Sequence, residues 1–129
     1  MYLLGVPMAV NLDVTFSPEK LKMNAKNDAF LVLKFTNTDN EKIFWCETDV
    51  LVKHPLSLAF DRELELGRTR VGILKPNKSA EKKVRIYTRP NNYPGAYSLA
   101  ITAYVYDEEG VISERLERKA EVECVEIRE

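Results

Sequence analysis

The residues that could carry out chemistry are few in this chain and are scattered along it. Its only histidine, His54, stands beside Pro55 in an expected loop, and no second histidine is present to share a metal ion with it. No serine lies in a nucleophile elbow, so a Ser-His-acid triad has no obvious nucleophile. Metal centres and acid–base catalysis usually need clustered His, Cys or carboxylate groups. We therefore expect no enzyme activity, no cofactor and no resident metal.

The carboxylates form two local groups, Asp107-Glu108-Glu109 and the series Asp61, Glu63 and Glu65. A calcium site would need several oxygen atoms converging on one point. We interpret the first group more simply as the solvated tip of a hairpin. Asn77-Lys78-Ser79 fits a glycosylation sequon, which is a chance match unless the chain is secreted. The residues do not reveal whether a small molecule binds.

Length and charge restrict the class of protein further. The chain of 129 residues, 45% of them hydrophobic, is expected to form a single domain over residues 1–129. Its 19 basic and 20 acidic residues give a net charge of −1, which predicts neither nucleic acid nor an anionic membrane as partner and offers little resistance to self-association. No apolar run is long enough for membrane insertion. Glutamine is absent while Lys and Glu are abundant, a profile typical of heat-adapted proteins.

The first eight residues, 1–8, are apolar, but Pro7 interrupts them and they lack the basic flank of a secretory signal. We interpret them as part of the fold or as an interaction arm. Leu3 and Leu4 would then either cover the open end of the domain or cross to a second subunit. The expected location is the cytoplasm, and an extracellular location is the alternative if the chain is a module of a larger protein.

Apolar and polar residues alternate along most of the chain, which indicates strands. The expected strands cover residues 10–16, 30–35, 43–52, 56–60, 68–74, 84–86, 97–105 and 112–124. In the last of these, Ile112, Leu116, Ala120 and Cys124 are also spaced as on a helix, but the turn Asp107–Gly110 favours a hairpin. About seven strands joined by short turns predict an all-β sandwich.

The expected hairpin also predicts a register. Tyr106 opposite Val111 would place Tyr97 opposite Ala120. Residues 121–127 would then extend past the partner strand, where pairing with the N-terminal strand would seal an edge that otherwise invites aggregation.

The run Tyr93-Pro-Gly-Ala-Tyr-Ser-Leu99 resembles the F-strand signature of immunoglobulin-like domains, Gly-x-Tyr-x-Cys, at Gly95 and Tyr97. Residues 74–106 also resemble modules of the fibronectin III and CARDB type, which serve as binding or spacer domains. This resemblance implies an immunoglobulin-like antiparallel sandwich with Greek-key connections. It also implies that the Tyr97 hydroxyl forms a corner with a nearby loop. Leu99 replaces the cysteine of the signature, so the usual disulfide between the sheets should be missing.

The same resemblance bears on the two cysteines, Cys46 and Cys124. In the implied sheet their strands flank a third strand and lie roughly 10 Å apart, whereas a disulfide needs Cα atoms within about 7 Å. We expect two buried thiols in a reducing compartment rather than a disulfide. They form no Cys-x-x-Cys sequence, so redox catalysis is not expected.

One surface is expected to stand out. If the alternating residues Leu99 to Val105 face the core, then Tyr104 and Tyr106 face outward. A tryptophan on the third strand is common in the family. In this chain the more apolar face of that strand faces the core, which would place Trp45 outward as well. The implied topology makes these strands neighbours, so the three residues would form an aromatic patch of the kind enriched in binding sites. The alternative is scattered surface aromatics or tyrosines covered by a loop.

These observations predict a non-enzymatic protein-binding or structural module. We expect it to self-associate as a homo-oligomer through a sheet face or a sheet edge. An adhesion or cell-surface spacer module of a larger protein is the first alternative, and an enzyme is the least favoured one.

Overall fold

The computed structural model describes residues 9–22, 29–88 and 93–126, and the regular structure in these residues consists of strands. The expected arm at 1–8, with Leu3 and Leu4, lies outside the described residues. One sheet has the order β1 (Val10–Ser17), β3 (Ala29–Asn37), β7 (Ser79–Thr88) and β5 (Leu56–Ser57). The second has the order β2 (Lys20–Lys22), β9 (Ile112–Val125), β8 (Gly95–Tyr106), β4 (Phe44–Leu51) and β6 (Leu66–Leu74).

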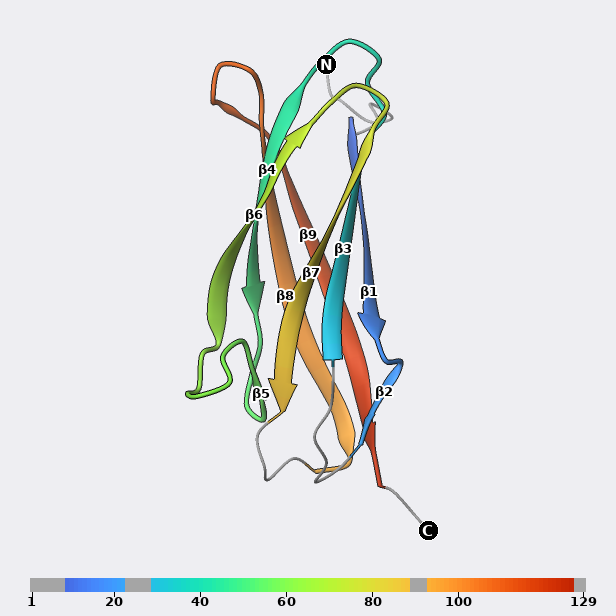
Figure 1. Ribbon diagram of the computed structural model, residues 1–129, viewed down its shortest axis with the longest axis vertical. Coiled ribbons are helices and arrows are strands. Elements are labelled where there is room, and N and C mark those ends of the chain that lie inside the picture. The colour runs from blue at the N-terminus through green and yellow to red at the C-terminus, as the bar shows by residue number, and fades with distance from the viewer. Residues whose placement is uncertain (1–8, 23–28, 89–92, 127–129) are drawn as a thin grey trace, which may run out of the picture.

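The two sheets face each other as the layers of an elongated sandwich (Figure 1). The order of the first sheet corresponds to strands A, B, E and D of an immunoglobulin domain. The second corresponds to G, F and C, with an added strand at each edge. The all-β, immunoglobulin-like sandwich predicted from the sequence is therefore confirmed. It has nine described strands rather than about seven, and the three-residue β2 is the one that the alternation did not predict.

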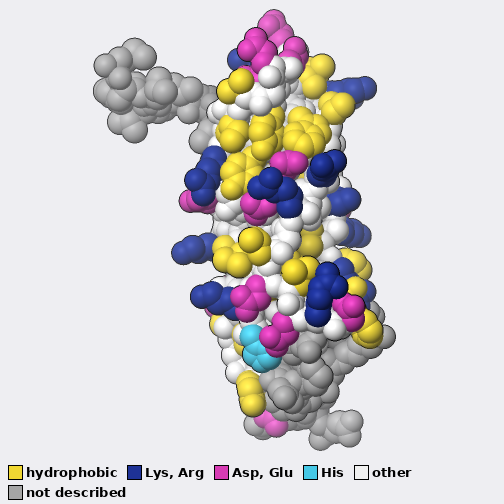
Figure 2. Space-filling model, turned by 90° about the vertical axis from the view of Figure 1, so that its left-hand side faces the viewer, with side chains coloured by type: hydrophobic (Ala, Val, Ile, Leu, Met, Phe, Trp, Pro, Cys, Tyr) yellow, Lys and Arg dark blue, Asp and Glu magenta, His cyan; other side chains and the backbone are white. Residues whose placement is uncertain are grey.

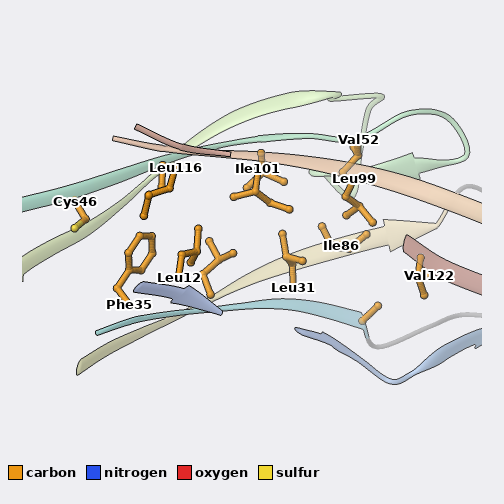
Figure 3. Packing of buried hydrophobic residues seen from close by; sticks show 14 of the residues in the cluster. Leu12, Leu31, Phe35, Cys46, Val52, Ile86, Leu99, Ile101, Leu116 and Val122 are labelled. Atoms are coloured by element: carbon orange, nitrogen blue, oxygen red, sulfur yellow. The ribbon is translucent and has the colours of Figure 1, made fainter. Parts of the chain in front are cut away.

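The core lies between the layers and is built by the predicted alternation. Along β3, every second residue from Ala29 to Asn37 is buried, and along β8 the buried series runs from Leu99 to Val105. Leu99, in the position of the cysteine of the family signature, is one of the buried apolar side chains that fill the space between the sheets (Figure 3). Since protein interiors are packed as densely as organic crystals, this layer holds the two sheets at a fixed separation.

The hairpin of β8 and β9 exists, and the helical alternative for residues 112–124 is excluded, but the predicted register is wrong by two residues over most of its length. Tyr97 pairs with Val122, not Ala120, and Tyr106 pairs with Ile112, not Val111. The backbone amide of Asp107 donates to the Val111 carbonyl at 2.9 Å, which closes a longer turn than expected.

This register changes what lies beyond the hairpin. Residues 121–124 pair with β8 instead of extending past it. The predicted pairing with the N-terminal strand is wrong, because β1 pairs with β3 in the other sheet. The last three residues of β9 are instead covered by β2, since Lys20–Lys22 runs parallel to Glu123–Val125.

The predicted strand at 56–60 is wrong beyond Ser57. Leu56 and Ser57 pair with β7, after which the chain turns away and leaves Phe60 largely exposed. The Ser57 hydroxyl is the centre of this turn, since Oγ lies 2.8–3.2 Å from backbone groups of Ala59, Arg62 and Leu64. A small polar residue that organises a loop in this way breaks the alternation on which the strand was predicted.

The cysteines are buried and form no disulfide, as predicted. Their separation is larger than the argument from strand spacing suggested. Cys46 pairs with Val105 at one end of β8, and Cys124 pairs with Gly95 at the other end. Ten residues of extended strand correspond to about 34 Å, so no disulfide between them is possible in this fold.

Candidate interaction surface

The three predicted aromatic residues lie on the outer face of the five-stranded sheet. Trp45 pairs with Tyr106 across β4 and β8, and their ring centroids are 5.3 Å apart with a tilt of 49° between the planes. Tyr104 lies two residues before Tyr106 on β8, on the same face and opposite Glu47. All three aromatic side chains are half-buried. Offset or tilted aromatic pairs at this distance attract each other beyond the area that they bury, so the contact stabilises the outward positions of the two rings.

Two exposed isoleucines extend the aromatic pair across the sheet. Ile73 on β6 pairs with Trp45, and Ile112 on β9 pairs with Tyr106. Their exposed fractions are 65% and 52%. We call these four residues, in the order Ile73, Trp45, Tyr106 and Ile112, the upper apolar row. It crosses four neighbouring strands.

The two-residue alternation does not predict that Ile73 and Ile112 lie on this face, because Ile112 is in phase with the buried Leu116 and Cys124 on the last strand. The physical reason is a β-bulge beside each residue. The register of β4 and β6 shifts between Cys46 and Glu47, and that of β8 and β9 shifts between Val105 and Tyr106. A bulge adds one residue to a strand and so changes the face on which its neighbours lie. The period-two pattern carries no signal for this change.

A group of charged residues follows the upper apolar row along the strands. Its first cross-strand row holds Arg70, Glu47, Tyr104 and Arg115, and its second holds Arg68, Asp49, Thr102 and Glu117. We call these two rows the charged band. Three arginines and three carboxylates make its formal charge zero.

The charges of the band are tied together by short contacts. Arg68 donates two hydrogen bonds to the Asp49 carboxylate, at 2.7 and 3.0 Å. Its Nη1 lies 3.5 Å from Oε2 of Glu47, whose other oxygen lies 3.9 Å from Nε of Arg70. The Tyr106 hydroxyl donates to Glu47 Oε2 at 3.3 Å. The Glu47 side chain is only 10% exposed, so water solvates its carboxylate poorly. The two arginines compensate its negative charge instead.

These contacts polarise the site. The hydrogen bonds from Arg68 lower the pKa of Asp49 below its ordinary value. Desolvation, followed by the negative charge of Glu47, raises the pKa of Tyr106. The guanidinium groups of Arg68 and Arg115 lie 5.4 and 5.9 Å from the centre of the Tyr104 ring, within the range of cation–π attraction. The band is therefore a fixed network of paired charges.

Apolar side chains return beyond the band. Leu51 pairs with Leu66 on one side and with Ala100 on the other. The two leucines are 40% and 58% exposed. We call Leu66, Leu51 and Ala100 the lower apolar row. Figure 2 shows the same succession, with hydrophobic side chains below the acidic tip, a band of charges beneath them, and hydrophobic side chains again below that band.

The other predicted residues lie away from this face. The Tyr97 hydroxyl donates to the Tyr93 carbonyl, a corner of the type implied by Gly95 and Tyr97. Gly95 has a φ of +147°, in the region that favours glycine. His54 pairs with Glu63 in a half-exposed loop, where Nδ1 lies 3.0 Å from Oε1.

The acidic groups have structural roles in the described part of the chain. Oδ1 of Asp107 accepts hydrogen bonds from the amides of Glu109 and Val111, at 2.9 and 3.0 Å, and shapes the hairpin tip. Asp61 pairs with Arg62 at 3.3 Å. Among residues 9–22, 29–88 and 93–126, no three His, Cys, Asp or Glu side chains are placed to hold a metal ion. The same residues include no helix suited to crossing a membrane.

These features define the class of the molecule as an immunoglobulin-like β-sandwich whose five-stranded sheet carries exposed apolar side chains on its outer face. No protein-family model and no curated protein sequence matches the chain. Among solved structures it is similar to BslA, a bacterial hydrophobin, with a TM-score of 0.55 and 9% identity over 95% of this chain and 98% of that one.

Two further structures share the fold. AvmM, which catalyses macrocyclization in alchivemycin A biosynthesis, has a TM-score of 0.51 and 11% identity over 94% of this chain and 91% of its own. BcpA, the major pilin subunit of Bacillus cereus, has a TM-score of 0.51 and 11% identity over 89% of this chain, which spans 39% of BcpA. Identities this low show a common fold and nothing about function.

Proposed function

We propose that this chain is a non-enzymatic protein-binding or structural module that self-associates through the outer face of its five-stranded sheet. The observation that carries the proposal is the upper apolar row. It places two exposed isoleucines, Ile73 and Ile112, beside the tilted Trp45–Tyr106 ring pair on the surface of the folded domain. Contiguous apolar patches rimmed by charges are typical of protein-interaction sites.

The energetics favour a partner on this face. Complete burial of an isoleucine side chain stabilises a complex by roughly 1.5–3 kcal/mol, so covering the exposed parts of Ile73 and Ile112 contributes about 1 kcal/mol each. Trp and Tyr are enriched among the residues that dominate binding energy. Their positions are already fixed by the ring contact and by the Tyr106–Glu47 hydrogen bond, so little side-chain entropy is lost on association.

The alternatives have less support. BcpA is named as a pilin subunit, which is consistent with assembly of sandwiches of this class. AvmM is named as a catalyst, but in this chain the single histidine is paired with Glu63 in a loop away from the face. No observation therefore favours an enzyme.

An adhesion or spacer module of the CARDB or fibronectin III type is the second candidate. It is favoured by the shape of the domain, because β1 begins near one end of the long axis and β9 finishes near the other (Figure 1). That arrangement suits domains linked in series. For the self-associating module we propose a cytoplasmic location, and an extracellular location belongs with the spacer alternative.

Sedimentation velocity over a wide concentration range tests the proposal. The wild-type chain should show a concentration-dependent rise in mass, and Ile73→Ser should weaken association at least fivefold. Phe60→Ser is the matched control, because Phe60 is 77% exposed and lies outside the face. It should associate like the wild type. A strictly monomeric wild type, or equal weakening by both variants, would contradict the proposal.

A further inference from the structure

One long edge of the five-stranded sheet is open in the described part of the chain. The last strand, β9, pairs with β8 on one side from Ile112 to Cys124. On its other side the paired strand among the described residues is β2, which reaches only residues 123–125. The edge from Ile112 to Val122 therefore presents backbone N–H and C=O groups to which another strand can bind.

The charges in the middle of this edge are ordered so that the strand is complementary to itself. Residues 114–118 read Glu-Arg-Leu-Glu-Arg, and the same segment read backwards is Arg-Glu-Leu-Arg-Glu. When two copies run antiparallel with Leu116 opposite Leu116, Glu114 of each copy faces Arg118 of the other. In the same register Arg115 of each copy faces Glu117 of the other. All four charged pairs then join unlike charges.

We infer that two copies of this chain join antiparallel along β9, with Leu116 at the two-fold axis, so that their five-stranded sheets form one continuous sheet. This β9 edge contact goes beyond the proposed function, because it uses the edge of the sheet and not its outer face. The axis is perpendicular to the sheet, so the outer faces of both copies lie on the same side. Self-complementary contacts of this kind generate closed dimers.

The pairs agree with the faces from which the side chains project. Directly opposed residues of an antiparallel pair share one face of the sheet. Arg115 and Glu117 both belong to the charged band on the outer face. Glu114, Leu116 and Arg118 all lie on the inner side, because the residues of β8 with which they pair are in the core. Each proposed pair therefore joins two side chains on the same face.

On the outer face the pairing closes a ring of alternating charge. Within one chain, Nη2 of Arg115 lies 3.1 Å from Oε1 of Glu117, and the two side chains are 59% and 69% exposed. In the dimer each arginine also faces the glutamate of the partner, at the Cβ separation of about 5 Å that is typical of directly opposed residues. Every charge of the ring then has two neighbours of opposite sign.

On the inner face the arginine of the partner compensates a buried charge. The carboxylate oxygens of Glu114 are buried without a hydrogen-bond partner of good geometry. Arg118 is exposed and donates to the carbonyl of its neighbour Glu117 at 2.8 Å, so it can turn toward Glu114 of the partner without disturbing the core. A positive charge beside a buried carboxylate lowers the cost of its burial.

The same charges reject the neighbouring registers. A dimer centred on Arg115 sets two arginines against each other, and one centred on Glu117 sets two glutamates against each other. A dimer centred on Arg118 matches the charges on the outer face, but it has two arginines at its axis. Like charges directly opposite each other destabilise a sheet. The opposite edge of the sheet, β6, contains two arginines and no acidic residue, so it offers no comparable match.

Exchange of the charges tests this register. Sedimentation velocity would be carried out in the Ile73→Ser chain, in which the outer face is weakened, so that the β9 edge contact is measured by itself. Arg115→Glu sets glutamate against glutamate, and Glu117→Arg sets arginine against arginine. Each variant alone should therefore associate at least tenfold more weakly than the Ile73→Ser parent. An equimolar mixture of the two should recover the association of the parent to within about threefold, because the outer pairs of the heterodimer again join unlike charges.

Glu121→Arg in the same Ile73→Ser chain is the matched control. Glu121 is also exposed on the outer side of β9, but it faces no charged residue when Leu116 is at the axis. It would face Arg115 if Arg118 were at the axis. The control should therefore associate like the parent, and the Tm of every variant is measured to show that the chain is folded.

The outcomes separate the edge from the face. If the mixture does not recover association, or if Glu121→Arg weakens it as much as Arg115→Glu does, the proposed register is wrong. If the Ile73→Ser parent is strictly monomeric while the wild type associates, the β9 edge contact is wrong and the proposed function stands. If Ile73→Ser associates like the wild type and the mixture recovers association, the edge contact stands and the proposed function fails.

Discussion

Replacement of Glu114 by glutamine is expected to stabilise the domain at neutral pH. Glu114 lies on β9 opposite Val105, whose side chain is in the core. Both carboxylate oxygens are buried, and neither has a hydrogen-bond partner of good geometry. Burial raises the pKa of Glu114, although the nearby amides of Val10 and Ala9 act in the opposite direction. We conclude that desolvation dominates, because hydrogen bonds with poor geometry compensate little of its cost.

The magnitude follows from the cost of an unsatisfied polar group. Such a group costs about 1–3 kcal/mol when it is buried, and Glu114 belongs at the lower end because the residue as a whole is only partly buried. Glu114→Gln removes the charge and keeps the shape. We therefore expect the free energy of unfolding at pH 7 to rise by about 1 kcal/mol, which for a domain of this size raises the Tm by about 4 °C.

The pH dependence gives a second, independent test. Because its pKa is higher in the folded than in the unfolded chain, Glu114 contributes stability below its unfolded pKa and loses that contribution as the pH rises through its folded pKa. The advantage of Glu114→Gln should therefore be small at pH 4 and reach its full value near pH 7. Urea unfolding at both pH values measures it, with the exposed Glu121→Gln on the same strand as control. A variant that is less stable than the wild type at pH 7, or an advantage that does not change with pH, would refute the reasoning.

The remaining predictions concern the core, the corner and the thiols. Phe35→Ala, which empties a fully buried position, should lower the free energy of unfolding by about 3–5 kcal/mol in urea titrations; a loss below about 1 kcal/mol would mean that Phe35 does not fill the core. Tyr97→Phe removes the hydrogen bond to the Tyr93 carbonyl and should cost about 1 kcal/mol in the same assay, whereas an unchanged midpoint would show that the corner contributes nothing. Burial raises the pKa of the Cys46 thiol to about 12, so iodoacetamide at pH 8 should label Cys46, identified by peptide mass spectrometry, only after denaturant is added. Rapid labelling of the native protein would contradict this.

The sequence was informative wherever strands alternate without interruption. The buried series on β8 and β3 and the outward positions of Trp45, Tyr104 and Tyr106 all follow from the two-residue period. These positions could be predicted because a strand that is covered on one face must alternate in polarity. The same alternation placed the two cysteines in the core, whereas the absence of a disulfide between them was predicted from the sheet topology that the resemblance implies.

The prediction failed where a local hydrogen bond or a bulge interrupts the period. Ser57 ends β5 by binding the backbone of its own loop, and Asp107 lengthens the hairpin turn by accepting from the Val111 amide. Both depend on how a side chain bonds to nearby backbone, which hydrophobic periodicity does not report. The network around Glu47 was also missed, because its arginines come from β6, more than twenty residues away in sequence.

The bulges connect these failures with the candidate surface. Both lie at the same end of the sheet, next to the Trp45–Tyr106 pair. On β6, Gly72 has a φ of +105°, a conformation open to glycine and strained for other residues, and this turn of the backbone lets Val71 pack against the core while Ile73 faces outward. On β9 the second bulge places Ile112 beside Tyr106. Two bulges that each move an isoleucine from the core side to the surface cost ladder hydrogen bonds and apolar burial. That cost is offset when another surface covers the isoleucines, which is the physical reason for assigning binding to this face.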